Sequence, residues 1–212
     1  MARAMIMKET FQRLVLLYLI GKFPNGVFSS FRLQKVLYYG TCNEGVQPKP
    51  FTFQYTRYGQ YSCDARGVLD EMYEEGLLEQ EKLKGESQGV RWQTGTIIDA
   101  EVVRSSVEAG FPKLAKAIGD SIQEYGFMKQ RELDERVHAD PILEEVQLGG
   151  ILIEEDPESR VATRLDEEIV EDLEILLTPG FVPAMAKLTR TVATTDFEIS
   201  QVRTIDSLDA LL

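Results

Sequence analysis

The feature that most constrains the fold is the order of periodic segments in the first 95 residues. Three segments place apolar side chains three and four positions apart, which is the spacing of one buried face of an α-helix; they cover about residues 8–21, 31–40 and 63–75. Two shorter apolar segments follow at about 77–83 and 90–94, joined by a polar, glycine-bounded turn. Because such a pair is typical of a β-hairpin, the sequence predicts three helices and then a hairpin.

Capping residues mark where the second and third of these helices begin and end. Ser29 or Ser30 can accept a hydrogen bond from the first turn of the second helix, and Ser62 can do the same for the third. Gly40 and Gly76 stand where these two helices are expected to end, since glycine adopts the left-handed conformation of a helix C-terminus without strain.

Helix, helix, helix and hairpin is the element order of a winged helix. We therefore expect a mainly α protein with a small β-hairpin, in the α+β class, whose residues 1–95 form a winged-helix-like module. A generic helical domain with one hairpin is the alternative. Residues 51–55 alternate apolar and polar side chains, so a short extended segment is expected between the second and third helices.

Further helical segments follow the hairpin. Residues 99–108, 111–125 and 128–138 read as helices, and we expect residues 96–157 to continue the first domain. The charged segment at 154–159 is the expected boundary, and residues 158–212 are expected to form a small acidic helical extension.

Charge is distributed unevenly along the chain. The 212 residues carry a net charge of −12. The first 60 residues contain eight Lys and Arg against two Glu, a net charge of +6, so the remaining residues carry −18. Such asymmetry indicates an interaction surface. The basic segment suits an acidic partner, whereas the acidic remainder repels phosphate groups.

The residues that carry most enzyme chemistry are scarce. His138 is the single histidine, and Cys42 and Cys63 are the only cysteines, too few for a four-ligand zinc site built from Cys and His. No phosphate-binding glycine motif occurs. We expect no catalytic centre, no metal and no cofactor. Three features favour a cytoplasmic protein without a membrane span. The two cysteines are expected to stay reduced thiols, we find no secretory signal, and no apolar stretch approaches about 20 residues.

Two motifs resemble the Panacea antitoxin-type domain family. Residues 33–39 read Leu-Gln-Lys-Val-Leu-Tyr-Tyr, which is similar to a Leu-Gln-Lys-Leu-Leu-Tyr-Tyr helix of that family. Residues 55–62 read Tyr-Thr-Arg-Tyr-Gly-Gln-Tyr-Ser, and a related group of small bacterial proteins has Tyr-Gly-Pro-Tyr-Ser there. The Panacea family commonly has Tyr-Gly-Pro-Val at the same place, and Gln60 replaces the proline of both groups. The resemblance covers about residues 10–95 and implies direct neutralisation of a toxin or, in one branch, delivery of a client to a protease.

We therefore expect a non-enzymatic protein-interaction module that binds a partner protein, a toxin or a client; a homo-oligomer is compatible with the sequence. Basic side chains beside aromatic rings with polar tips suit protein interfaces. Five residues combine these properties and form the predicted partner-binding surface: Arg32, Lys35, Tyr39, Arg57 and Tyr61. Tyr38 and Tyr58 are expected to pack between the second and third helices.

A DNA-binding transcriptional regulator with a winged helix is the alternative function. In that class the third helix commonly lies in the major groove. Here residues 62–76 contain Arg66 against five carboxylates, a net charge of −4. DNA affinity depends largely on cations that neutralise phosphates, so we expect no nucleic-acid binding by the isolated protein.

Overall fold

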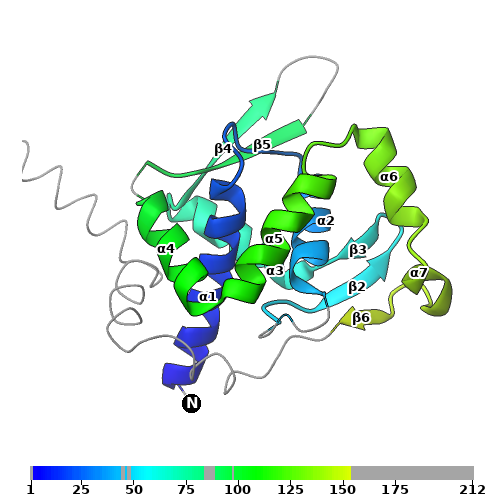
Figure 1. The fold of residues 1–212 in the computed structure, drawn as a ribbon, viewed down its shortest axis with the longest axis horizontal. Helices are drawn as coiled ribbons and strands as arrows, with labels where there is room; N and C mark the ends of the chain where they lie inside the picture. Colours follow the sequence, from blue (N-terminus) through cyan, green and yellow to red (C-terminus); the bar gives the residue numbers. More distant parts are fainter. Residues whose placement is uncertain (1, 44–45, 47–48, 84–88, 97, 154–212) are drawn as a thin grey trace, which may run out of the picture.

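The α+β class expected from the sequence is confirmed in a computed structural model of the chain, in which two small antiparallel sheets lie at the edges of a group of helices (Figure 1). The structure describes residues 2–43, 46, 49–83, 89–96 and 98–153. The predicted boundary at 154–159 and the predicted C-terminal extension at 158–212 lie outside the described residues, which end at residue 153.

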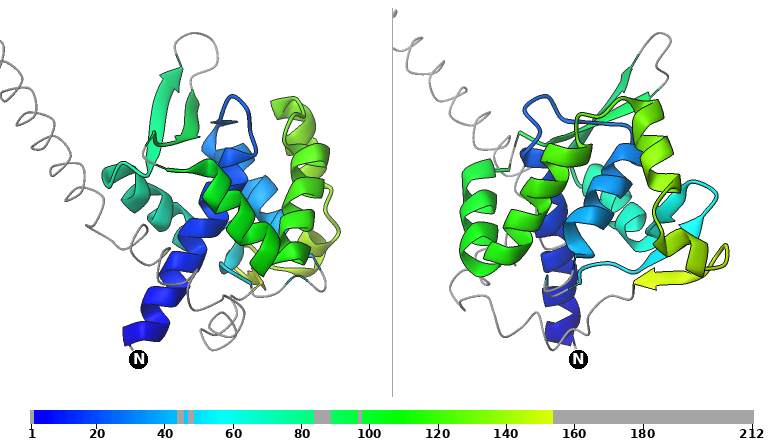
Figure 2. Two further views of the ribbon diagram at one scale, coloured as in Figure 1. Left: turned by 60° about the vertical axis from the view of Figure 1, so that its left-hand side comes forward. Right: turned by 45° about the vertical axis from the view of Figure 1, so that its right-hand side comes forward.

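Helix α1, Ala2–Gly21, runs through the fold, and α4, Ala100–Gly110, lies beside it (Figure 2). It contacts α3, Cys63–Glu74, α4 and strand β5, Gly89–Thr94, so residues 14–20 are buried on every side. A single apolar stripe was expected at this helix. The burial extends further because α4, which follows residue 95, covers a face of α1 that residues 1–95 alone would leave exposed.

Helices α2, Ser30–Thr41, and α3, Cys63–Glu74, begin at the predicted caps. The Ser29 hydroxyl accepts a hydrogen bond from Arg32 N at 3.2 Å, and the Ser62 hydroxyl accepts one from Ala65 N at 3.1 Å. Gly76 has the left-handed φ of +79° expected after a helix. Gly40 does not end its helix, because α2 continues through Thr41.

The first sheet contains the predicted hairpin. Strands β4, Leu78–Leu83, and β5, Gly89–Thr94, pair antiparallel, and β1, Val27–Phe28, pairs with β5 to give the order β1-β5-β4. The helix and hairpin order that motivated the winged-helix-like expectation is thus present, with β1 as an added strand. The winged-helix-like description itself stays a prediction.

The second sheet joins distant parts of the chain. Strand β2, Phe53–Thr56, pairs antiparallel with β3, Gly59–Tyr61, and with β6, Ile151–Ile153. Gly59 has a φ of +78° at the turn between β2 and β3. Because β6 lies almost 100 residues after β2, this sheet ties the end of the described chain to its first half.

The helices after the hairpin pack onto the first ones. They are α4, Ala100–Gly110; α5, Pro112–Tyr125; α6, Gln130–His138; and α7, Ile142–Glu145. Helix α5 lies against α2, where a Cβ on Gly40 would stand 3.1 Å from Ile118, and Ser121 Oγ donates to Val36 O at 2.8 Å. Gly40 therefore permits close helix packing rather than ending α2.

Residues before and after position 95 contribute to one hydrophobic core. Among the residues that the structure describes, no helix is both long enough and apolar enough to cross a bilayer.

Candidate interaction surface

The Leu-Gln-Lys helix motif points into the protein rather than outward. Gln34 Oε1 accepts a hydrogen bond from Ser62 N at 2.9 Å, and Gln34 Nε2 donates to Ser62 O at 3.1 Å. Ser62 also caps α3. This pair of bonds from one buried amide fixes the start of α3 against α2, so the motif has a direct structural role.

Lys35 is buried, with 1% of its surface exposed. Its Nζ donates to Gln60 O and lies 4.9 Å from the ring centre of Phe31. No carboxylate of the described residues stands at ion-pair distance from it. Burial therefore lowers the pKa of Lys35 to about 7, although the negative charge of Asp134 opposes this.

The expectation that Lys35 forms an exposed basic face with Arg32 is therefore wrong. The hairpin of β2 and β3 covers this side of α2 and supplies the carbonyl that receives the amine. A polar side chain that finds such a partner can be buried, and a sequence pattern does not reveal the partner.

Tyr39 is half-buried and tied to the same region. Its hydroxyl donates to Asp140 Oδ2 at 3.0 Å, and the Gln60 amide donates to the same carboxylate oxygen at 3.0 Å. The Tyr39 ring stacks on Tyr125 with centres 4.3 Å apart. Burial, with the Asp140 charge second, raises the pKa of Tyr39 well above its ordinary value. Tyr39 thus links α2 to the chain after α6.

The two predicted residues of the β2–β3 hairpin differ in exposure. Arg57 is exposed, and its guanidinium carbon lies 4.6 Å from the ring centre of Tyr58. Tyr58 is 53% exposed, so its predicted core position is wrong, whereas Tyr38 is buried as predicted. Tyr61 is half-buried, and burial raises the pKa of its hydroxyl, with the positive charge of Arg66 opposing.

Arg32 lies apart from these four residues, at a groove that the sequence did not predict. Its guanidinium donates to Gly126 O at 2.6 Å through Nη1 and to Met128 O at 2.7 Å through Nη2. These carbonyls follow α5, where the negative end of a helix dipole favours a cation. Burial lowers the pKa of Arg32.

The groove has a volume of about 400 Å³ and lies between residues 23–32 and the connection between α5 and α6. Phe28 is 42% exposed and Phe127 is 68% exposed at its sides, and the Phe23 ring lies 5.6 Å from that of Phe127. We call it the Phe28–Phe127 groove. Its lining consists of Phe23, Pro24, Asn25, Gly26, Phe28, Arg32, Gly126, Phe127 and Met128.

The two exposed phenylalanines escaped the sequence analysis because they stand outside the periodic segments. Phe127 lies in a helix connection, and Phe28 ends a strand of two residues. A large apolar residue in a short connection is the signal that could have indicated this site.

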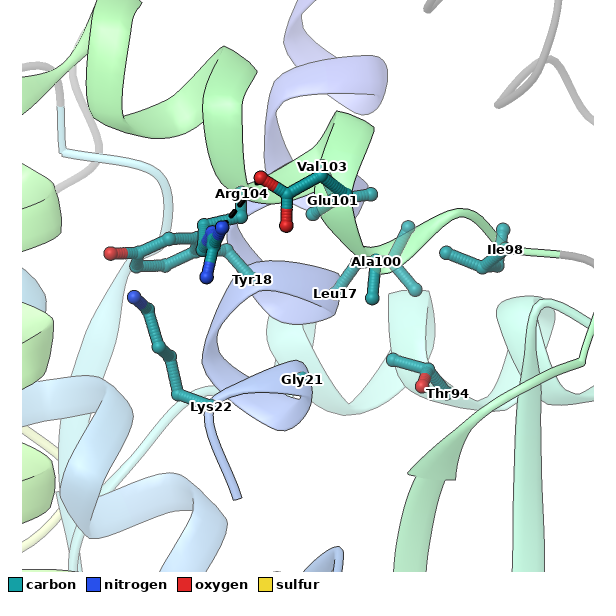
Figure 3. Close-up of a pocket in the computed structure, with 10 residues that line it drawn as sticks. All are labelled: Leu17, Tyr18, Gly21, Lys22, Thr94, Ile98, Ala100, Glu101, Val103 and Arg104. Atoms are coloured by element: carbon teal, nitrogen blue, oxygen red, sulfur yellow. Dashed lines mark hydrogen bonds and ion pairs between the residues drawn. The ribbon is translucent and has the colours of Figure 1, made fainter. Parts of the chain in front are cut away.

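A second hollow, of about 220 Å³, lies between the end of α1 and the start of α4 (Figure 3). Its charged groups pair with one another or with near neighbours. Lys22 Nζ donates to Glu108 at 2.8 Å, and Arg104 pairs with Glu101. Since these charges are already compensated, this hollow offers less to a charged ligand than the Phe28–Phe127 groove.

Helix α3 presents carboxylates to solvent. Asp64, Glu71 and Glu74 are exposed, and Arg66 pairs with Asp70 at 2.8 Å within the same helix. This face therefore carries a net negative charge, as the sequence indicated.

His138 lies at the end of α6 with its Nε2 3.6 Å from an Asp134 carboxylate oxygen. In the described part of the chain, no three His, Cys, Asp or Glu side chains gather in a way that could hold a metal ion.

No protein-family model matches this chain, and no curated protein is recognisably similar to it in sequence. The resemblance to the Panacea antitoxin-type domain therefore stays a prediction that rests on the two motifs.

Proposed function

We propose that the protein is a non-enzymatic interaction module that binds a partner protein at the Phe28–Phe127 groove. The observation that carries the proposal is the pair of exposed phenyl rings beside a hollow whose one charged lining residue, Arg32, meets no carboxylate of the described residues. Single exposed apolar side chains are common on proteins, but two aromatic rings flanking a groove are typical of a binding site.

The motif resemblance supports an antitoxin-like role for this module, in which the partner is a toxin or a client presented to a protease. The buried Gln34 and Lys35 bonds fit a scaffold role for the shared motif, because they hold the hairpin and α3 in place while other surfaces make contact. On this proposal the protein works in the cytoplasm. Arg57 and Tyr61 remain candidates for contacts at the β2–β3 hairpin.

The DNA-binding alternative is less well supported. The exposed carboxylates of α3 would face the phosphates if that helix entered the major groove. Arg66, the one cation of α3, is paired with Asp70.

Affinity capture from the native host, followed by mass spectrometry, tests the proposal. The tagged wild-type chain is compared with the Phe28→Ser/Phe127→Ser double variant and with Leu148→Ser, whose side chain is as exposed as that of Phe127 but lies elsewhere. We expect a protein that the wild type and the Leu148 variant retain and the double variant loses. Identical captured proteins for all three chains would contradict the proposal, provided that their thermal unfolding curves agree.

A further inference from the structure

We propose that the Phe28–Phe127 groove takes a partner segment that presents a carboxylate next to a large apolar side chain. This inference rests on the proposed function and adds the chemistry of the partner.

Arg32, the cation of the groove, keeps N–H groups that are not used in hydrogen bonds with the described residues. Arg32 uses one N–H of each Nη atom for a backbone carbonyl, so each Nη keeps a second N–H. Its Nε is buried and has no hydrogen-bond acceptor among the described residues. The carbonyls orient the guanidinium but do not neutralise it, so a full positive charge stands at the wall of an apolar groove.

Among the residues that the structure describes, the lining of the groove contains Arg32 and no carboxylate. At the rim, the Arg91 guanidinium lies 4.4 Å from the ring centre of Phe28, and Arg91 pairs with Glu81 at 3.0 Å. The carboxylate of Glu81 is therefore already engaged outside the groove. A carboxylate brought by a partner would meet a guanidinium that no carboxylate of the described residues compensates, and the attraction strengthens as the partner covers the aromatic walls and displaces water.

The size and composition of the groove define the rest of the ligand. About 400 Å³ lies in the lower part of the 300–1,000 Å³ range of small ligand sites and suits one or two side chains. Phe23, Phe28, Phe127 and Met128 supply apolar walls for an aromatic or aliphatic side chain.

A single-stranded nucleic acid also combines stacking with negative charge, but it is disfavoured here. Such ligands need several cations along a groove that follows the backbone. The Phe28–Phe127 groove offers one unpaired cation in a chain with a net charge of −12.

Selection of peptides from a displayed random 12-residue library, with the full chain as bait, tests the inference. We expect enrichment of sequences that place Asp or Glu beside Leu, Ile, Phe or Trp. The best peptide is then measured by fluorescence anisotropy in three forms: unchanged, with its acidic residue changed to the amide, and with its C-terminus amidated. Loss of the charge-assisted bond should weaken binding about tenfold or more. The form that loses affinity identifies a side-chain or a terminal carboxylate.

Changing the peptide leaves the protein intact, so the outcome does not depend on whether Arg32→Gln folds. In a folded Arg32→Gln variant the acidic and amide peptides should bind equally, and Leu148→Ser should bind like the wild type. Any one of four results would overturn the inference. These are enrichment of basic or neutral peptides, an unchanged affinity for the amide peptide, no loss of peptide affinity in the Phe127→Ser variant, and displacement of the peptide by a single-stranded oligonucleotide. If capture still depends on Phe28 and Phe127 while the peptide carboxylate has no effect, the proposed function stands and only the partner chemistry is wrong.

Discussion

Replacing Lys35 by methionine is expected to stabilise the protein near neutral pH and to remove part of the pH dependence of its stability. Methionine has a similar length and no amine, so it fills the same space in the core. The reason for the expected gain is that Lys35 is almost fully buried without a carboxylate at contact distance among the described residues.

The sign follows from the direction of the pKa change. The folded-state pKa of Lys35 is lowered from 10.5 to about 7, so the unfolded chain binds the additional proton between these values. Stability therefore falls as the pH drops from about 10.5 towards 7, and it levels off below the folded-state pKa. At 1.36 kcal/mol for each tenfold change in proton affinity, the amine costs the wild type about 4 kcal/mol at pH 7 and about 1.5 kcal/mol at pH 9.5.

The variant also loses a hydrogen bond to Gln60 O, which costs about 1–3 kcal/mol if the carbonyl stays unpaired. That loss is the same at both pH values and cancels when they are compared. The difference in unfolding free energy between the Lys35→Met variant and the wild type should therefore be roughly 3 kcal/mol more favourable at pH 7 than at pH 9.5.

Urea unfolding followed by circular dichroism at the two pH values measures this difference. Lys116→Met is the matched control, because Lys116 is a solvent-exposed lysine that pairs with Asp120 on the surface of α5. The control should show a change of well under about 1 kcal/mol between the two pH values. A Lys35→Met effect that is equal at pH 7 and pH 9.5 would contradict the prediction, since the buried amine would then remain protonated without a penalty.

Three further predictions concern the hairpin turn, a buried ion pair and nucleic acid. Gly59→Ala should lower the unfolding free energy in a urea titration by about 2 kcal/mol or more, because φ is +78° and a Cβ there would collide with Val137. The control Gly119→Ala lies in a helix with open space around the site, so it should be neutral or stabilising by up to about 1 kcal/mol in the same titration. Glu75→Gln should lower the unfolding free energy, measured by thermal unfolding, by about 1–3 kcal/mol, because Arg13 is buried and its Nη1 pairs with Glu75 at 2.5 Å. A decrease below about 0.5 kcal/mol would show that Glu9 and Glu71, the other carboxylates around Arg13, compensate fully. The isolated protein should not bind its own promoter region in a fluorescence titration at about 150 mM salt, and a sequence-specific complex tighter than about 1 μM would instead favour the transcriptional-regulator alternative.

Local sequence patterns predicted most of the helices and the β4–β5 hairpin. Helix periodicity and the caps at Ser62 and Gly76 depend on residues close together in the chain, so they can be predicted from the sequence alone. Strands β1, β3 and β6 were missed or only partly anticipated, because two or three residues are too few for alternation to show. Their pairing depends on partners elsewhere in the chain.

The candidate site was harder to predict than the fold. Arg32, Lys35 and Tyr39 stand three and four residues apart in the sequence, but this spacing does not show what covers each side chain. Only the tertiary structure shows that the β2–β3 hairpin covers Lys35 and that Asp140 lies beside Tyr39.

The Phe28–Phe127 groove likewise exists only in the folded chain, since two connections almost 100 residues apart form it. Periodicity reports which residues avoid water, whereas the position of a buried cation or an exposed aromatic ring depends on which distant backbone groups and side chains surround it. For this protein the sequence therefore determined the helices and the hairpin, and the packing between them decided which of its basic and aromatic side chains remain available to a partner.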